Sequence, residues 1–110
     1  MSRGDYLGEF EQLVLLALVR LGPGAYGLAV RRELEERTGR SPAIGAVYAT
    51  LDRLEEKGLV VSTLGDSSKV RGGRARRCFR LTADGALKLR ESQRTLSRML
   101  DGLGKSWRPA

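Results

Sequence analysis

The chain has 110 residues, with 20 Lys or Arg, 13 Asp or Glu and no histidine, and its net charge is +7. This length fits one small domain, and no apolar run approaches the roughly 20 residues that cross a bilayer, so we expect a soluble, cytoplasmic protein. A single cysteine excludes an internal disulfide, and without histidine the usual zinc sites and nucleophile pairs cannot form. We therefore expect no metal, no cofactor and no enzymatic activity.

The positive charge is concentrated in one short segment. Residues 65–80 carry six basic side chains against one acidic side chain, a net of +5, whereas residues 1–64 have a net of −1. The phosphate backbone of a nucleic acid is a natural partner for such a local field. Taken alone, a charge run of this kind can also serve solubility only.

Apolar residues recur at helical spacing from Phe10 to Leu21 and predict the first helix. Leu15, Leu16 and Val19 make this helix apolar nearly all round, so it needs cover on two sides. We expect one side in the core and the other against the C-terminal helix of the same or another subunit. Gly22-Pro23-Gly24 ends the helix.

A shorter second helix is predicted around Tyr26, Val30 and Leu34. Ser41-Pro42 then supplies an N-cap and a first helical residue for a third helix over 41–57, which Gly58 ends. Two helices joined by a short turn that contains glycine form a helix-turn-helix.

The third helix has two different faces. Its apolar stripe is expected to join the core and consists of Ile44, Val47, Tyr48, Leu51 and Leu54. Its other face carries Gly45, Ala46, Ala49, Thr50 and Arg53. Small residues let a helix backbone enter the roughly 12 Å wide major groove, where arginine reaches a guanine edge or a phosphate and threonine a base edge or the backbone.

Two other interpretations of this helix stay open. The small residues would also suit close packing against a neighbouring helix. Tyr48 lies on the core stripe, so we expect it to anchor the helix, with its hydroxyl at the rim or on a phosphate, and we do not assign it to base readout.

A hairpin follows the third helix. Residues 59–64 are β-branched and extended, and residues 77–81 alternate as a returning strand. The intervening loop, 65–76, contains Gly72-Gly73 and most of the excess arginine. The fold class is therefore mainly α with a small β-hairpin, a winged helix-turn-helix whose basic wing spans 65–80.

In this order, these segments resemble the PadR-like family of winged-helix transcriptional regulators. The resemblance covers roughly residues 9–90 and is carried by Gly22-Pro23, Tyr26-Gly27, residues 41–51, residues 54–60 and residues 77–85. It implies a homodimeric repressor that binds operator DNA with the third helix in the major groove and the wing on the backbone or minor groove. It maps DNA contact onto Ser41, Gly45, Tyr48, Ala49, Thr50 and Arg53 and, in the wing, Lys69, Arg71, Arg74, Arg76 and Arg77.

The chain departs from the family pattern at two places. Cys78-Phe79 stands where the returning strand usually has an aromatic pair, and the wing loop is longer and more basic than the common short turn. The second departure suggests more backbone affinity or a deeper reach into the minor groove, where a narrow groove favours arginine.

The last helix is expected to join two subunits. Thr82 can cap it, and leucines recur every seven residues along it. We expect residues 86–110 to form a dimerisation helix and tail after a DNA-binding domain at 1–85. The expected interface also uses the first helix and consists of Leu15, Val19, Leu89, Leu96, Met99, Leu100 and Leu103. Such a dimer predicts a pseudo-palindromic operator, with recognition helices roughly 34 Å apart.

Three functions stay open at this point: a sequence-specific regulator, a winged-helix module that binds a protein partner, and a nucleic-acid-binding protein that uses charge alone. A small-molecule effector could bind in a dimer cavity, where Trp107 would suit a planar ligand, although a terminal tryptophan can also simply pack. Cys78 is either a redox-sensing thiol or an inert cysteine in a strand.

Overall fold

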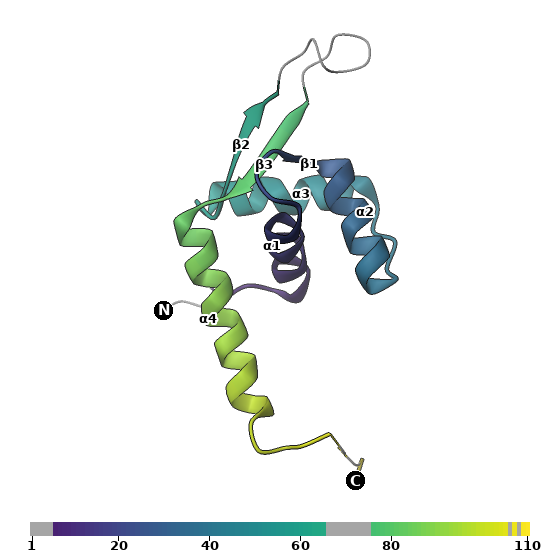
Figure 1. Cartoon of the computed structure of the whole chain (residues 1–110), viewed down its shortest axis with the longest axis vertical. Coiled ribbons are helices and arrows are strands. Elements are labelled where there is room, and N and C mark those ends of the chain that lie inside the picture. Colours follow the sequence, from purple (N-terminus) through teal and green to yellow (C-terminus); the bar gives the residue numbers. More distant parts are fainter. Residues whose placement is uncertain (1–5, 66–75, 106, 108) are drawn as a thin grey trace.

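The computed structural model describes residues 6–65, 76–105, 107, 109 and 110. Within these residues the chain folds into four helices and one antiparallel sheet of three short strands (Figure 1). The elements in chain order are α1 (Glu9–Leu21), β1 (Ala25–Tyr26), α2 (Gly27–Thr38), α3 (Ile44–Glu56), β2 (Val60–Leu64), β3 (Arg77–Leu81) and α4 (Ala83–Leu100). No helix in the described part of the chain is long and apolar enough to cross a membrane.

The predicted hairpin is confirmed, and a third strand joins it. β2 and β3 pair antiparallel with Ser62 opposite Phe79, and β1 adds to the free edge of β3 with Ala25 opposite Phe79. The hairpin extends away from the helices, on the side of the molecule opposite the free end of α4 (Figure 1). β1 has only two residues and forms because the chain leaves α1 beside the edge of β3.

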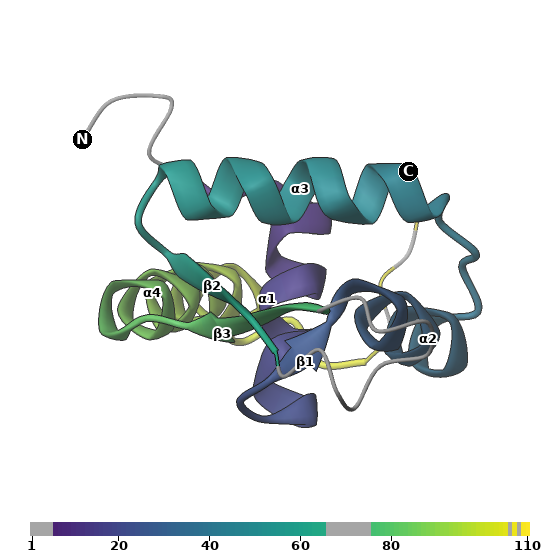
Figure 2. The same cartoon turned by 90° about the horizontal axis from the view of Figure 1, so that it is seen from above.

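α1 is the central helix of the fold. It contacts α2, α3, α4 and β3, which explains why its sequence is apolar nearly all round. In Figure 2, α3 lies along one edge of the molecule, with α1, the sheet and α2 on a single side of it. One broad face of α3 is thereby left uncovered by the described elements.

The core fixes the orientation of α3. Val47, Leu51 and Leu54 are fully buried and share a cluster with Phe79 of β3. The prediction for Ile44 was wrong, because this residue begins the helix and is 40% exposed. The buried stripe of α3 therefore begins at Val47, not at Ile44.

The start of α3 also differs from the prediction. The helix begins at Ile44 with Ala43 as its N-cap, so Ser41 is not the cap. The Ser41 hydroxyl instead donates to Glu35 Oε2 at 2.8 Å. The backbone oxygen of Pro42 accepts from Arg31 Nε at 2.7 Å. These contacts fasten the turn to α2 and delay the helix by about one turn.

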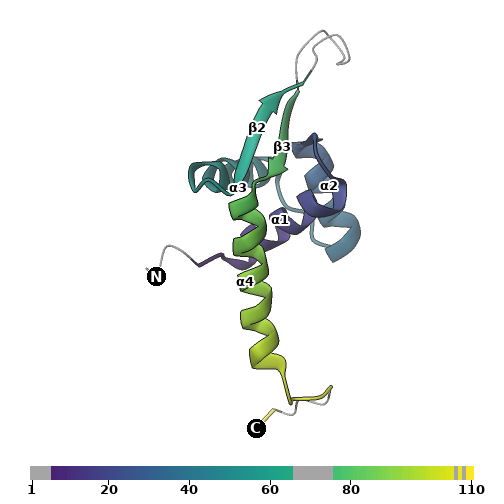
Figure 3. The same ribbon diagram turned by 60° about the vertical axis from the view of Figure 1, so that its left-hand side comes forward.

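α4 begins as predicted, with the Thr82 hydroxyl accepting the Gly85 amide at 3.0 Å. Its first half packs on α1 and the sheet, and Leu89 is buried there. Its second half extends away from the other elements (Figure 3). The leucines of that half, Leu96 and Leu100, are exposed in the single chain.

Candidate nucleic-acid interface

The first half of α3 presents a smooth, open surface. Gly45, Ala46 and Ala49 are exposed, and a Cβ added at Gly45 would meet no atom within 4 Å. Close packing against another helix therefore does not explain these residues within the protomer. What remains is a helix face on which the backbone itself is accessible to a partner.

Thr50 does not belong to this face. It is 3% exposed and lies three residues after Val47, on the side that enters the core. Its hydroxyl oxygen accepts from Arg53 Nη2 at 3.4 Å, a long hydrogen bond. This burial contradicts the expected contact of Thr50 with DNA. The Thr50 hydroxyl supports Arg53 instead.

Tyr48 is half-buried and anchors α3 on the rest of the domain. Its ring lies over Gly27 of α2, where an added Cβ would collide with the ring. The ring centroid is 6.3 Å from that of Phe79, with the planes tilted by 55°. This position agrees with the anchoring role inferred from the core stripe.

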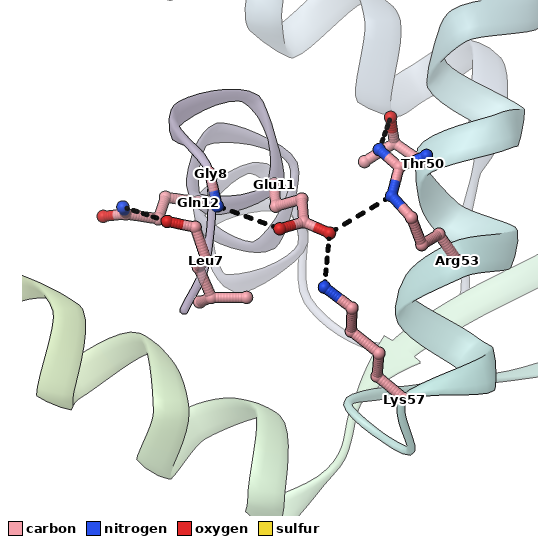
Figure 4. Close-up of polar contacts among 7 residues, drawn as sticks. All are labelled: Leu7, Gly8, Glu11, Gln12, Thr50, Arg53 and Lys57. Atoms are coloured by element: carbon pink, nitrogen blue, oxygen red, sulfur yellow. Dashed lines mark hydrogen bonds and ion pairs between the residues drawn. The ribbon is translucent and has the colours of Figure 1, made fainter. Parts of the chain in front are cut away.

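A buried carboxylate, not expected from the sequence, organises the second half of α3 (Figure 4). Glu11 of α1 is only 7% exposed. Its Oε2 lies 2.9 Å from Lys57 Nζ and 3.3 Å from Arg53 Nε. Its Oε1 accepts the Gly8 amide at 2.9 Å. The only sequence signal for it was its place three residues after the glycine that precedes α1, where a carboxylate can reach back to a free amide.

The surroundings of Glu11 favour its charged form. Burial raises the pKa of its carboxyl group, but the Gly8 amide, Lys57 and Arg53 outweigh burial and leave the pKa below its usual value. Glu11 is therefore an anion at neutral pH. The Arg53 side chain that it holds is still 52% exposed.

Arg77 begins β3, opposite Leu64 at the loop end of the paired strands, and is engaged within the protein. Its Nη1 is 2.7 Å from Asp52 Oδ1, and its Nη2 is 2.7 Å from Glu55 Oε1. Its guanidinium carbon also lies 4.9 Å from the centre of the Phe79 ring. Both carboxylates belong to α3, so the expected role of Arg77 as a phosphate contact is replaced by a link between β3 and α3.

Asp52 was not included among the candidate residues. It is exposed and lies next to Arg53 on α3, so the open face carries an acidic as well as a basic side chain. The ion pair with Arg77 offsets its negative charge. Without that pair, a carboxylate would stand unmasked beside the surface proposed for a polyanion.

The remaining wing residues are described only in part. Arg76 is exposed, and its guanidinium carbon lies 4.3 Å from the centre of the Tyr26 ring, within the range of a cation–π contact. The predicted contacts Lys69, Arg71 and Arg74 fall outside the described residues.

Two residues of the expected subunit interface are buried within the single chain. Leu15 and Leu89 are buried in the core of the single chain, so neither can form an interface with a second copy. The other members of the set are exposed: Val19, Leu96, Met99, Leu100 and Leu103. Val19 lines an apolar groove between α1 and α4 together with Leu16 and Ala86.

The two candidate sensing residues have ordinary surroundings. Cys78 is half-buried in β3, with its sulfur 3.8 Å from the Arg76 carbonyl oxygen. Trp107 is 64% exposed, and its Nε1 donates to the Gly104 carbonyl at 3.2 Å. Neither environment points to a ligand or to a reactive thiol.

Three helices, with the third open on one face and followed by a β-hairpin, define a winged-helix protein of the DNA-binding type. The sequence profile of the transcriptional regulator PadR-like family matches residues 15–91. The chain therefore belongs to the PadR-like family of transcriptional regulators. A family of regulators, not of enzymes, agrees with the expectation drawn from the missing histidine.

Individual relatives support this assignment. The transcriptional regulator Rv3488 of Mycobacterium tuberculosis is 39% identical over 74 residues, which is 67% of this chain and 64% of that protein. The match thus spans a little under two thirds of the relative's length. A PadR family regulator from Eggerthella lenta is 31% identical, with a TM-score of 0.67 over 87% of this chain and 83% of the other.

A more distant structure shares the fold alone. F93 from STIV, described as a winged-helix DNA-binding protein, is 16% identical. Its TM-score is 0.71, over 88% of this chain and 97% of F93.

Proposed function

We propose that the protein is a homodimeric repressor that binds a pseudo-palindromic operator. α3 enters the major groove, and the basic wing, 65–80, follows the backbone or the adjacent minor groove. The observation that carries this proposal is the open face of α3, where Gly45 and Ala49 expose the helix backbone beside a half-exposed arginine.

Shape and charge act together on this face. A helix without bulky side chains can approach the base edges closely, so its first half reads the groove mainly through fit. Arg53 lies one helical turn after Ala49. Its guanidinium has the donor geometry that suits guanine or a phosphate. Ser41 and Tyr48 stand near the start of the helix, where we expect contact with the backbone.

The wing supplies affinity without sequence preference. Residues 65–80 have a net charge of +5, and each phosphate that they neutralise releases counterions. Since Arg77 is paired with carboxylates of α3, we assign the phosphate contacts to Arg76 and to Lys69, Arg71 and Arg74.

A second copy of the chain is the proposed occupant of the groove between α1 and α4. The groove presents Leu16, Val19 and Ala86, and the exposed leucines of α4 offer a complementary apolar surface on a partner. Two such helices packed together would cover side chains that a monomer leaves in water. A two-fold axis would then present two copies of α3 to one side of DNA.

The test of DNA recognition starts with duplexes that the wild-type protein selects from a randomised library. Fluorescence anisotropy against a selected and a scrambled duplex should give a preference of about a thousandfold near physiological salt. Arg53→Ala should lose about 1–3 kcal/mol of this discrimination, because a good arginine contact with a base is worth that much. Arg37→Ala, which removes the same charge at the exposed end of α2, is the matched control.

Other outcomes would point to other functions. Equal affinity for both duplexes, with a steep dependence on salt, would indicate binding by charge alone. No binding to either duplex would favour a module that recognises a protein partner. Repression is tested separately, by transcription in vitro from a promoter that overlaps the selected site; a rise in transcript would show an activator.

The test of the dimer uses sedimentation. Leu96→Asp places a charge in the proposed interface and should reduce the mass from two chains to one. Leu64→Asp, at the end of β2, makes the same change at a residue that is 73% exposed and should leave the mass unchanged. A dimeric mass for Leu96→Asp would contradict the interface.

A further inference from the structure

The end of α3 that faces α1 contains a three-residue cluster formed by Glu11, Arg53 and Lys57 (Figure 4). One oxygen of the Glu11 carboxylate, Oε2, accepts hydrogen bonds from both cations, at 3.3 Å from Arg53 Nε and 2.9 Å from Lys57 Nζ. The other oxygen is held by the Gly8 backbone amide. The hydrogen bond to the backbone at the start of α1 thus fixes the position of the carboxylate independently of the Arg53 and Lys57 side chains.

Burial in this cluster is uneven. The Glu11 side chain is 9% exposed, whereas those of Arg53 and Lys57 are 52% and 33% exposed. The anion therefore lies beneath the surface and the cations lie upon it. A partner that approaches α3 meets the cations, while Glu11 acts on them from the protein side.

The cluster restricts how Arg53 can be presented. Nε donates to Glu11, and Nη2 donates to Thr50, so two of the three guanidinium nitrogens are held by the protein. Nη1 makes no hydrogen bond or ion pair to any described residue. A side chain that is oriented before binding loses less rotamer freedom when it meets its target.

The cluster also limits non-specific attraction. Two positive charges and one negative charge leave a net of +1 at this corner, and Glu11 competes with any phosphate for both cations. A phosphate at an arbitrary position therefore gains little binding energy from Arg53 and Lys57. A duplex whose groove fits the oriented Arg53 gains the full contact.

We propose that Glu11 is a positioning residue for DNA recognition: it orients Arg53 toward the bases and withholds Arg53 and Lys57 from non-specific phosphate contacts. This inference rests on the proposed function. Glu11 does not contact DNA in this proposal. It raises the ratio of the affinity for specific DNA to the affinity for non-specific DNA.

The experiment compares Glu11→Gln with wild type on the selected and scrambled duplexes. Glutamine keeps the shape and can still accept the Gly8 amide, but it releases both cations. We expect tighter binding to the scrambled duplex and a salt slope steeper by about 0.9, the value of one added phosphate contact. We expect the specificity ratio to fall by roughly five- to tenfold, a part of what a good arginine–base contact supplies.

Glu33→Gln is the matched control. Glu33 of α2 also holds two cations, with its Oε2 at 3.0 Å from Arg20 Nε and 3.2 Å from Arg37 Nε, and these residues belong neither to α3 nor to the wing. The substitution changes the net charge by the same amount, and we expect the specificity ratio and the salt slope to stay at the wild-type values. If both variants behave alike, the effect is one of net charge and the proposal is overturned.

A purely structural role would have a different signature. Glu11→Gln would then lower the denaturant midpoint while leaving the ratio and the slope unchanged, which would overturn the proposal. Should Glu11→Gln fail to fold, the double variant Glu11→Gln/Lys57→Gln keeps the net charge of the cluster at +1. Loss of discrimination in the double variant would support orientation of Arg53, and an unchanged ratio would refute it.

The wild-type protein distinguishes a failure of the proposed function from a failure of the role given to Glu11. If it does not prefer the selected duplex, the proposed function fails, and this inference fails with it. If it does prefer that duplex while Glu11→Gln retains the wild-type ratio and slope, only the role of Glu11 is refuted.

Discussion

Removal of Arg77 should weaken DNA binding even though its guanidinium is turned toward the protein. The side chain joins β3 to α3 through Asp52 and Glu55, each at 2.7 Å. Arg77→Ala changes the charge of this group of three from −1 to −2. The released Asp52 carboxylate would then stand beside Arg53, on the face that we propose for DNA.

The cost to stability should be modest. The side chains of Arg77, Asp52 and Glu55 are 37%, 49% and 32% exposed, so solvent screens both ion pairs. Partly exposed pairs contribute about 0.2–1 kcal/mol each, and the substitution should lower the free energy of unfolding by about 0.5–2 kcal/mol in total. The domain should remain folded, which thermal unfolding checks.

The cost to DNA affinity follows from Coulomb's law. A unit charge roughly 8 Å from a phosphate repels it by about 0.5 kcal/mol in water before salt screening. Two or three phosphates at comparable distances give a loss of about 1 kcal/mol, or roughly fivefold in affinity, on selected and scrambled duplexes alike.

A double-mutant cycle with Asp52→Asn distinguishes masking from direct contact. If Arg77 acts by neutralising Asp52, then Asp52→Asn should restore most of the affinity that Arg77→Ala loses, as measured by anisotropy. If Arg77 itself binds phosphate, the loss should persist in the Asp52→Asn background and the salt slope should fall by about 0.9. That second result would contradict the masking role of Arg77.

Two further substitutions and one titration test the fold. Gly85→Ala should lower the free energy of unfolding by about 1–3 kcal/mol, because a Cβ there collides with the Leu59 carbonyl oxygen, whereas Gly45→Ala, in open space on α3, should be neutral or slightly stabilising. Urea midpoints would contradict this if both variants shifted equally. Hydrogen bonds and cations lower the pKa of Glu11 and Glu55, so their stabilisation is present at neutral pH and is lost as the pH falls below the ordinary carboxyl value of 4.5. Glu11→Gln should reduce the amount by which the free energy of unfolding falls at acid pH. An unchanged pH profile would show that Glu11 does not contribute to this fall.

Local patterns predicted the fold well. The apolar spacing of the helices, the Thr82 cap and the hairpin strands depend on neighbours in sequence, and each is present in the structure. Gly58 adopts φ 78° after α3, as a helix stop requires. β1 was missed because two residues carry no periodic signal, and its pairing depends on the edge of β3.

The errors in the candidate site have a common cause. Thr50 was assigned to the outward face of the third helix, but its spacing from Val47 puts it on the core side of α3, where it is 3% exposed. Arg77 was placed at the start of the returning strand and counted with the basic wing, but its guanidinium faces two carboxylates of α3. In both cases DNA was the expected partner, whereas contacts with the rest of the fold hold the side chain.

Asp52 and Arg53 show why charge counting alone cannot describe this surface. They are adjacent in sequence and of opposite sign, so an isolated helix would present them as a cancelling pair. Their side chains leave the helix about 100° apart, and each meets a different neighbour. Glu11 of α1 holds Arg53, while Arg77 of β3 holds Asp52. Fixed charges on the two flanking elements thus separate the cation from the anion, and the arginine stays available at the open face while Arg77 offsets the charge of the carboxylate.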